Sequence, residues 1–151
     1  MALNNPNTKK IIIYTDGACK GNPGKGGWGV VIIANSIISK ELSGSCDNTT
    51  NNIMEMTAAI EALSHFKTCK DILIFTDSKY VLLGVTEWIH NWKKNNWLNK
   101  KKEQIKNKTL WLELDRLNSF HSIEWKWVKA HNGDPGNERA DYLASQAATD
   151  L

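Results

Sequence analysis

The pattern of apolar and polar positions changes its period along the chain, and each period predicts a different element. Residues 11–16 (IIIYTD) and residues 72–77 (ILIFTD) are runs of apolar, mostly β-branched and aromatic residues, a pattern typical of strands buried on both faces. Each run passes through Thr to an aspartate, Asp16 in the first and Asp77 in the second. We therefore predict two buried strands that each end in a carboxylate.

The residues that follow the first strand predict an antiparallel meander. Residues 21–27 (GNPGKGG) indicate a wide turn, and residues 28–34 have the composition of a second strand. Asn35 and Ser36 can form a tight reversal into a third strand over residues 37–45. The glycine spacing does not match a P-loop, so we interpret this segment mainly as a turn whose glycines also let a bulky ligand approach the backbone.

Residues 50–67 have the 3.6-residue period of a helix. One face carries an apolar stripe that we expect to pack on the sheet, made of Met56, Ala59, Ile60 and Leu63. Glu55 flanks this stripe and can face Asp16 across the sheet edge. The competing interpretation is structural, because Asn52 followed three residues later by Glu55 fits a capping box at the start of the helix.

The second half of the chain predicts more helices and one more strand. Ser78 can cap a helix directly after the second Asp-ending strand, and another helix is expected near residues 110–117. The alternation over residues 123–128 is typical of a half-exposed edge strand. Asp134 and Pro135 suit the cap and the first turn of a last helix. This order predicts an α/β domain, a mixed sheet flanked by helices.

Length and composition indicate one domain. Of the 151 residues, we expect residues 1–9 to be a polar lead-in and residues 10–149 to form a single domain with a basic protrusion around residues 93–108. The polar start is unlike a signal peptide, and the longest apolar run, residues 30–34, is too short to cross a bilayer. The three cysteines form neither a disulfide framework nor a zinc pattern, so we expect reduced thiols and the cytoplasm. A monomer is the default expectation.

The net charge of +3 is distributed unevenly. Residues 93–108 contain seven lysines and one glutamate, a local balance of +6, so the rest of the chain sums to −3. A basic segment beside an acidic body is typical of proteins that bind polyanions, although an ordinary lysine-rich surface has the same composition. The nearby tryptophans Trp88, Trp92 and Trp111 have the spacing of a small local core, which we favour over nucleic-acid contact.

Four carboxylates from separate segments are the candidate chemistry. If the two Asp-ending strands are parallel neighbours, Asp16 and Asp77 emerge at one edge about 5 Å apart. Like charges this close are unfavourable unless a cation lies between them. Glu55 and Asp141, each at the margin of the apolar stripe of its helix, can complete the set. Oxygen ligands without cysteine or paired histidine fit Mg²⁺ or Mn²⁺.

Such a set of carboxylates can support phosphodiester hydrolysis. Two ions about 3.5–4 Å apart can bind both the attacking water and the leaving oxygen of an in-line displacement. A histidine nearby can move a proton, because its pKa lies near working pH. His131, in a glycine-containing loop, is the best placed of the four histidines.

These residues lie in motifs that are similar to those of a known family. The chain closely resembles bacterial ribonuclease H type 1, whose members cut the RNA strand of RNA/DNA hybrids, over residues 11–148. Five motifs carry the resemblance in this order: TDGACKGNPG with GGWG, TTNNIMEMTAAIEAL, FTDSKYV, GVTEWIHNWKKNNW and WVKAHNGDPGNERADYLA. The resemblance implies a five-stranded mixed sheet flanked by helices, an RNA/DNA hybrid as partner, and cleavage that leaves 5′-phosphate and 3′-hydroxyl ends.

The resemblance also implies roles for individual residues. The catalytic metal ions, Mg²⁺ or Mn²⁺, would be bound by Asp16, Glu55, Asp77 and Asp141, and His131 would carry protons and speed product release. The minor groove of the hybrid, where RNA 2′-hydroxyls are read, would be contacted by Gly17, Cys19, Asn22, Asn51 and Lys79. A DNA phosphate would be bound by Thr50 and Asn107, and the DNA strand by the basic protrusion with Trp88, Lys93 and Lys94.

Four residues at three places depart from the bacterial pattern. Lys79 stands where Gln is frequent, Ile53 where Arg is familiar, and Asn95-Asn96 where Arg-Gly is common. These departures concern substrate contacts, since all five catalytic positions are intact. Two alternatives stay open, a DNA nuclease of the same superfamily, such as a resolvase or a transposase-like enzyme, and a catalytically silent hybrid-binding module. The minor-groove set argues against the first and the intact carboxylates argue against the second.

Overall fold

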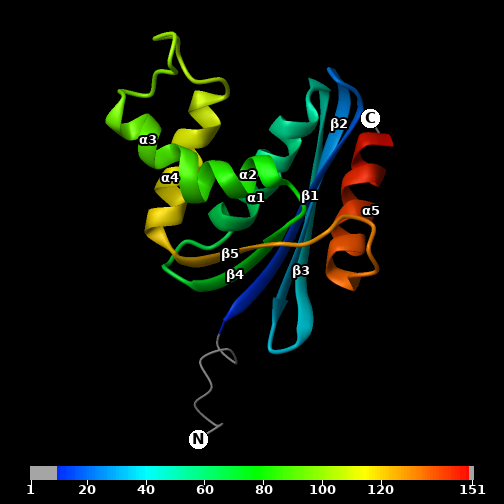
Figure 1. Cartoon of the computed structure of the whole chain (residues 1–151). Coiled ribbons are helices and arrows are strands. Elements are labelled where there is room, and N and C mark those ends of the chain that lie inside the picture. The colour runs from blue at the N-terminus through cyan, green and yellow to red at the C-terminus, as the bar shows by residue number, and fades with distance from the viewer. Residues whose placement is uncertain (1–9, 150–151) are drawn as a thin grey trace, which may run out of the picture.

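Five strands form one mixed sheet in which the central strand lies between an antiparallel and a parallel neighbour (Figure 1). The computed structural model describes residues 10–149. The strands are β1 (Ile11–Gly21), β2 (Gly24–Ala34), β3 (Ile37–Thr49), β4 (Asp71–Thr76) and β5 (Ser122–Trp127). Their order is β3-β2-β1-β4-β5, with β1, β4 and β5 parallel to one another. The predicted α/β fold with a five-stranded mixed sheet is confirmed. The two Asp-ending strands are parallel neighbours, which is the condition for their carboxylates to emerge at one edge.

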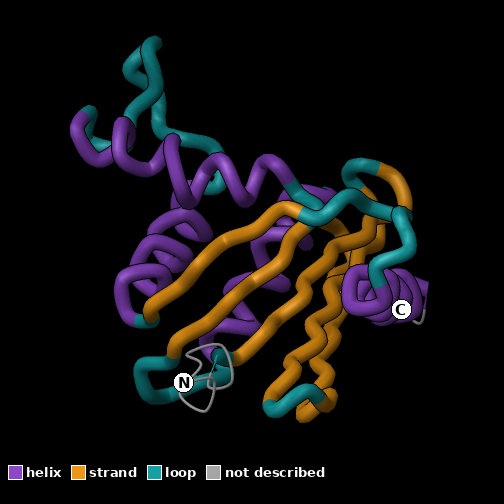
Figure 2. The backbone as a smooth tube through the Cα atoms, turned by 60° about the horizontal axis from the view of Figure 1, so that its bottom comes forward, coloured by secondary structure: helices purple, strands orange, loops and turns teal. Residues whose placement is uncertain are grey.

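Helices cover both faces of the sheet (Figure 1, Figure 2). They are α1 (Asn51–Ser64), α2 (Lys79–Leu83), the π-helical turn η3 (Gly84–Trp88), α3 (Ile89–Lys94), α4 (Lys108–Phe120) and α5 (Pro135–Thr149). Helix α5 packs on one face, and α1 and α4 lie on the opposite side. Gly29 of β2 permits the close approach of α5, because a Cβ atom there would lie 2.5 Å from the carbonyl oxygen of Ala140.

The main core fills the space between the sheet and α1. Ile13 of β1 and Ile74 of β4 are fully buried there. The predicted apolar stripe of α1 is confirmed, since its members Met56, Ala59 and Leu63 are also fully buried. Burial of a large side chain such as Met56 or Leu63 contributes roughly 1.5–3 kcal/mol, so this face fixes α1 on the sheet. Everything that α1 presents at the sheet edge is positioned by this packing.

A second cluster of aromatic rings connects the helices beyond the sheet. Trp111 of α4 is fully buried, with ring centroids 6.5 Å from Trp88 and 5.3 Å from Trp92. Gly84, at the start of the π-helical turn, makes room for it, because a Cβ atom there would lie 2.0 Å from the Trp111 ring. The interpretation of these tryptophans as a local core is confirmed. This cluster fixes α2 to α3, and therefore the basic segment that follows them.

The prediction that Asp16 ends its strand is wrong. The parallel pairing with β4 stops at Thr15 and Thr76, but β1 continues to Gly21 as the antiparallel partner of β2. The apolar run in the sequence marks only the part of β1 that β4 covers. Asp16 therefore lies within a continuous strand, at the point where one of its two neighbours ends.

Two further boundaries differ from the sequence prediction. The wide turn over residues 21–27 is a tight hairpin, because residues 24–27 already belong to β2 and only Asn22 and Pro23 connect the strands. The third strand extends to Thr49 rather than to residue 45. Glycine-rich sequence predicts a turn, but here the missing side chains allow helix α5 to pack directly on the strand, as at Gly27.

The starts of two helices test the capping predictions. At α1 the N-cap is Thr50, whose Oγ1 accepts a hydrogen bond from the backbone N–H of Ile53 at 3.2 Å. The interpretation of Asn52 and Glu55 as a capping box is therefore wrong. At α5 the prediction is confirmed, because Asp134 Oδ1 accepts hydrogen bonds from the N–H groups of Gly136 and Asn137.

The expected lead-in over residues 1–9 lies outside the described residues.

Among residues 10–149, no helix combines the length and the apolar character that a bilayer-spanning helix needs. The predicted edge position of β5 is confirmed, because it closes one side of the strand order.

Candidate active site

Three carboxylates meet where the parallel part of the sheet ends. Asp16 and Asp77 directly follow Thr15 and Thr76, the last parallel pair of β1 and β4. Glu55, in the second turn of α1, joins them from the helix that the core fixes on the sheet. One carboxylate oxygen from each of the three residues lies within 4.8 Å of the others. The structure thus brings together residues that are about 20 to 60 positions apart in the sequence.

Burial makes the negative charges of this group unfavourable. Asp16 is 4% exposed and Glu55 is 6% exposed. Burial, and next the charge of Asp77, raises the pKa of Asp16 to about 9, and Asp141 contributes to the same shift. Burial, followed by the charges of Asp16 and Asp77, also raises the pKa of Glu55 well above its ordinary value. Among the residues that the structure describes, these carboxyl groups are therefore favourable when they are protonated or when a cation lies among them.

The donor set fits a divalent metal ion. Oε1 of Glu55 is buried and has no hydrogen-bond partner among the described residues. A buried carboxylate oxygen without a partner is costly, but it becomes favourable as a metal ligand. Three hard oxygens at this spacing suit Mg²⁺ or Mn²⁺.

Asp141 and His131 lie beside this group rather than inside it. Asp141, on α5, comes close enough to Asp16 to raise its pKa, but it does not belong to the compact set of three. Nδ1 of His131 lies 4.0 Å from Oδ2 of Asp141. The His131 side chain is 77% exposed, and its backbone has a positive φ of 56°. The histidine is thus held at the surface, next to the fourth carboxylate.

Two residues at the site were not singled out from the sequence. Asn137 is buried and donates a hydrogen bond from Nδ2 to Oδ2 of Asp77 at 3.1 Å. Trp127 donates from Nε1 to the backbone carbonyl oxygen of Asp77 at 3.2 Å. Both contacts depend on the meeting of distant segments. The one local signal was that Asn137 falls on the same side of α5 as Ala140 and Ala144, where a polar residue needs a partner.

Four of the five residues expected at the minor groove, Gly17, Cys19, Asn22 and Asn51, gather around the β1–β2 turn and the start of α1, whereas Lys79 lies on α2. Oδ1 of Asn22 accepts a hydrogen bond from the N–H of Asn51 at 3.1 Å, so the turn and the helix are directly connected. The thiol of Cys19 donates to the carbonyl oxygen of Thr49 at 3.3 Å. Gly17 packs on α1, because a Cβ atom there would lie 2.5 Å from the backbone nitrogen of Glu55.

The other expected contact residues are more dispersed. Asn107 donates from Nδ2 to the hydroxyl of Tyr80 at 3.1 Å. Lys93 forms an ion pair with Asp115 at 2.9 Å. Lys94 is exposed and Trp88 belongs to the aromatic cluster.

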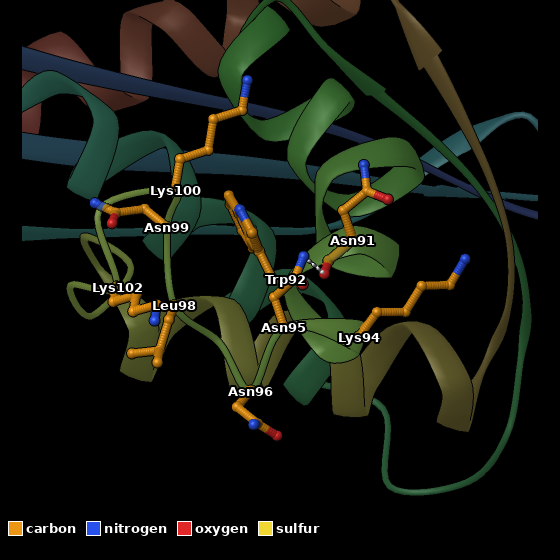
Figure 3. A pocket seen from close by; sticks show the side chains of 9 residues that line it. All are labelled: Asn91, Trp92, Lys94, Asn95, Asn96, Leu98, Asn99, Lys100 and Lys102. Atoms are coloured by element: carbon orange, nitrogen blue, oxygen red, sulfur yellow. Dashed lines mark hydrogen bonds between the residues drawn. The ribbon is translucent and has the colours of Figure 1, made fainter.

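The basic segment has a concave surface of its own (Figure 3). It has a volume of about 730 Å³ and is lined by Asn91, Trp92, Lys94, Asn95, Asn96, Leu98, Asn99, Lys100 and Lys102. The side chains of Lys94, Lys100 and Asn96 point away from one another in Figure 3. This surface therefore resembles an open polar groove more than a closed site for a small molecule. In Figure 1 the loop that follows α3 extends away from the sheet.

Comparison with known proteins shows to which family the chain belongs. The family model described as RNase H matches residues 8–149. The chain belongs to the RNase H family. The predicted resemblance is thus confirmed, and so is the prediction of a ribonuclease H enzyme.

Individual RNase H proteins agree with this assignment. Ribonuclease H of Francisella philomiragia is 52% identical over 146 residues, which cover 95% of each chain. Ribonuclease H of Francisella tularensis subsp. novicida is 52% identical over 142 residues, covering 94% of this chain and 93% of the relative.

Solved RNase H structures share the fold. The crystal structure of LC9-RNase H1, a type 1 RNase H with the type 2 active-site motif, superimposes with a TM-score of 0.81 at 33% identity, covering 94% of this chain and 73% of that one. LC11-RNase H1 in complex with an RNA/DNA hybrid has a TM-score of 0.71 at 25% identity, covering 93% of this chain and 98% of that one.

Proposed function

We propose that this protein hydrolyses the RNA strand of RNA/DNA hybrids with the help of divalent metal ions, leaving 5′-phosphate and 3′-hydroxyl ends. The observation that carries the proposal is the group formed by Asp16, Glu55 and Asp77, three carboxylates within 4.8 Å in a family of RNA-cleaving enzymes. Membership of the family and the hybrid-bound relative LC11-RNase H1 support the choice of substrate.

Each carboxylate has a proposed task as a metal ligand. Asp16 and Glu55 supply buried oxygens, and Asp77 supplies an oxygen whose direction is set by the hydrogen bond from Asn137. Asp141 completes the set from α5. Mg²⁺ is the proposed ion, with Mn²⁺ as a substitute. When bound, two such ions would activate the attacking water and stabilise the leaving oxygen of the in-line displacement.

His131 is the proposed proton carrier. Its ring is mostly exposed and lies 4.0 Å from Asp141, so it can exchange protons with solvent and with groups at the site. Since it is not part of the buried carboxylate group, its role is to assist turnover and product release rather than to hold the metal ions.

The edge beside the carboxylates is the proposed hybrid-binding surface. Asn22, Asn51 and Cys19 lie together there, and with Gly17 and Lys79 they are the proposed minor-groove contacts. Hydrogen bonds to 2′-hydroxyls would distinguish the RNA strand from DNA. Thr50 is the N-cap of α1 and Asn107 is the N-cap of α4, and these two are the proposed contacts to a DNA phosphate.

Residues 93–108 are the proposed protrusion that holds the DNA strand. Seven lysines lie in this segment, and several line the open groove of Figure 3. Lys94 is free to contact phosphate, whereas Lys93 would first have to break its ion pair with Asp115. Trp88 would contribute indirectly, because its ring packs on Trp92 of α3 and supports that helix. We further propose that the protein acts as a monomer in the cytoplasm, where its three free cysteines would stay reduced.

The test compares three labelled duplexes, RNA/DNA, RNA/RNA and DNA/DNA, each with Mg²⁺ and with EDTA. The proposal predicts internal cleavage of the RNA strand of the hybrid alone, in Mg²⁺ alone, with 5′-phosphate ends. Cleavage of duplex DNA would favour a DNA nuclease of the same superfamily. Binding of the hybrid without cleavage under any metal condition would favour a silent binding module.

A further inference from the structure

Trp127 holds its indole against the backbone of a carboxylate residue of the site. As the last residue of β5, it pairs with Thr76, and the next residue, Val128, donates its N–H to the carbonyl oxygen of Thr76 at 2.9 Å. Its Nε1 donates to the carbonyl oxygen of Asp77 at 3.2 Å. The bond from Val128 fixes the backbone beside Trp127 and the bond from Nε1 fixes the ring, although the residue is 42% exposed. An exposed tryptophan held this firmly presents a ready binding face.

Lys79 places its ammonium group over that face. Lys79 is the first residue of α2, and its Nζ lies 4.7 Å from the centroid of the Trp127 ring. Within residues 10–149, no carboxylate lies close enough to Lys79 to form an ion pair. A cation–π contact orients the ammonium group without neutralising it. Its N–H donors therefore stay available for an external anion.

The position of this cation gives it a function. Lys79 follows Asp77 by two residues, and the ring under its ammonium group is hydrogen-bonded to the backbone of Asp77, so the charge stands at the margin of the carboxylate group. That group, which is strongly negative when ionised, repels an approaching phosphodiester, and a fixed positive charge at its margin offsets the repulsion locally.

We propose that Lys79 and Trp127 form a phosphate-binding site for the RNA strand next to the linkage that is cut. Within the minor-groove set, Lys79 would then contact the RNA backbone at the groove edge rather than a 2′-hydroxyl, and Trp127 would position it. This inference rests on the proposed function, because the strand that reaches the carboxylates is then the RNA strand. A lysine suits a phosphate as a compact point charge. A free lysine side chain loses rotamer freedom on binding, and the Trp127 ring removes part of that cost in advance.

The test measures binding of a labelled RNA/DNA hybrid in EDTA at several KCl concentrations, with thermal unfolding of each variant as a check of folding. Lys79→Gln removes the charge, and Trp127→Leu removes the ring but keeps the charge. Lys40→Gln, an exposed lysine of β3 near the far end of the sheet, is the matched control.

The proposal predicts that Lys79→Gln weakens binding several-fold and lowers the slope of log K against log salt by about 0.9, the value for one lost phosphate contact. Trp127→Leu should weaken binding while the slope stays near that of the wild type. In the double variant the loss should equal that of Lys79→Gln alone, because the ring acts through the lysine. Lys40→Gln should match the wild type.

Two results would overturn the proposal, a wild-type salt slope in Lys79→Gln or losses that simply multiply in the double variant. If Trp127→Leu fails to fold, Trp127→Phe replaces it. It is a smaller change that loses the bond to Asp77, so the ring no longer holds Lys79 in place, and binding should again weaken with the slope unchanged. Wild-type protein that neither binds nor cuts the hybrid would reject the proposed function itself. Wild-type cleavage together with an unchanged Lys79→Gln variant would reject this inference alone.

Discussion

Asn137 donates a hydrogen bond from its buried amide to Oδ2 of Asp77 at 3.1 Å, and so connects helix α5 to the end of β4. The backbone N–H of Asn137 is bound in turn by Oδ1 of Asp134, which caps the same helix. One carboxylate oxygen of Asp77 therefore has a fixed direction before any metal ion arrives. Partners of metal ligands that act in this way commonly matter almost as much as the ligands.

Asn137→Ala should reduce the rate of hybrid cleavage by about 10- to 100-fold, the range typical of outer partners of metal ligands. The physical reason is that Asp77 loses the donor that orients it. Binding of the hybrid in EDTA should change little, because Asn137 is buried. Gln146→Ala, an exposed amide on the same helix, is the control and should keep wild-type cleavage. A cleavage rate in Asn137→Ala within twofold of the wild type would show that Asp77 is oriented without it.

Asp16→Asn should stabilise the metal-free protein, and the gain should grow with pH. The pKa of Asp16 is raised to about 9 in the fold and is near 3.8 when the chain is unfolded. Between these values the folded state holds a proton that the unfolded state has lost, so wild-type stability falls as pH rises, by at most about 1.4 kcal/mol per pH unit for one such group. The asparagine variant does not have this loss.

Thermal unfolding in EDTA at pH 5 and pH 8 measures this difference. The variant should exceed the wild type in Tm by a wider margin at pH 8 than at pH 5. Mg²⁺ should raise the Tm of the wild type more than that of the variant. Asp71→Asn, an exposed aspartate at the other end of β4, should show neither effect. Equal margins at both pH values would mean that Asp16 is ionised in the fold without penalty.

His131→Ala should slow multiple turnover without abolishing cleavage. The ring lies outside the buried carboxylate group, so metal binding stays intact while proton transfer becomes slower. General acid–base groups contribute about 10² to 10⁴ in rate, and a partial loss within that range is expected. The control is His65→Ala, an exposed histidine at the end of α1. Complete loss of single-turnover cleavage in His131→Ala would assign it a more essential task.

Replacement of Lys100, Lys101 and Lys102 by Gln should weaken hybrid binding and flatten its salt dependence. Each phosphate contact that is lost should lower the slope of log K against log salt by about 0.9. Cleavage at saturating hybrid should stay close to the wild-type rate, since these lysines belong to the protrusion and not to the carboxylate group. An unchanged slope would identify the segment as ordinary surface.

Local patterns predicted the elements of this fold well, whereas contacts between elements were harder to predict. The apolar runs before Asp16 and Asp77 were sufficient to predict two buried strands, because a strand buried on both faces has a distinctive composition. Their parallel pairing entered only as a condition, which the structure meets. For Glu55 the sequence permits two interpretations, since a helix period places a side chain on a face but does not show what lies opposite. Its burial against the aspartates depends on how closely Gly17 allows α1 to approach.

The partners of Asp77 show where sequence reasoning stops. Asn137 lies 60 residues away and Trp127 lies 50 residues away in the chain. No local period encodes such a meeting, which follows only from the parallel register of β4 and β5 and from the docking of α5. The boundaries of β1 and β2 were missed for a related reason, because glycines that make room for a helix have the same composition as glycines that form a turn.

The most direct test of the central claim is Mg²⁺-dependent cleavage of an internally labelled RNA/DNA hybrid by the wild type and by the Asp16→Asn and Glu55→Gln variants, at equal concentrations of folded protein. If the buried carboxylates hold the metal ions that act on RNA, the wild type cuts the RNA strand in Mg²⁺ and not in EDTA, and both variants are slower by at least about 10³-fold, the loss of several kcal/mol of transition-state stabilisation. Cleavage by either variant within tenfold of the wild-type rate would contradict the claim.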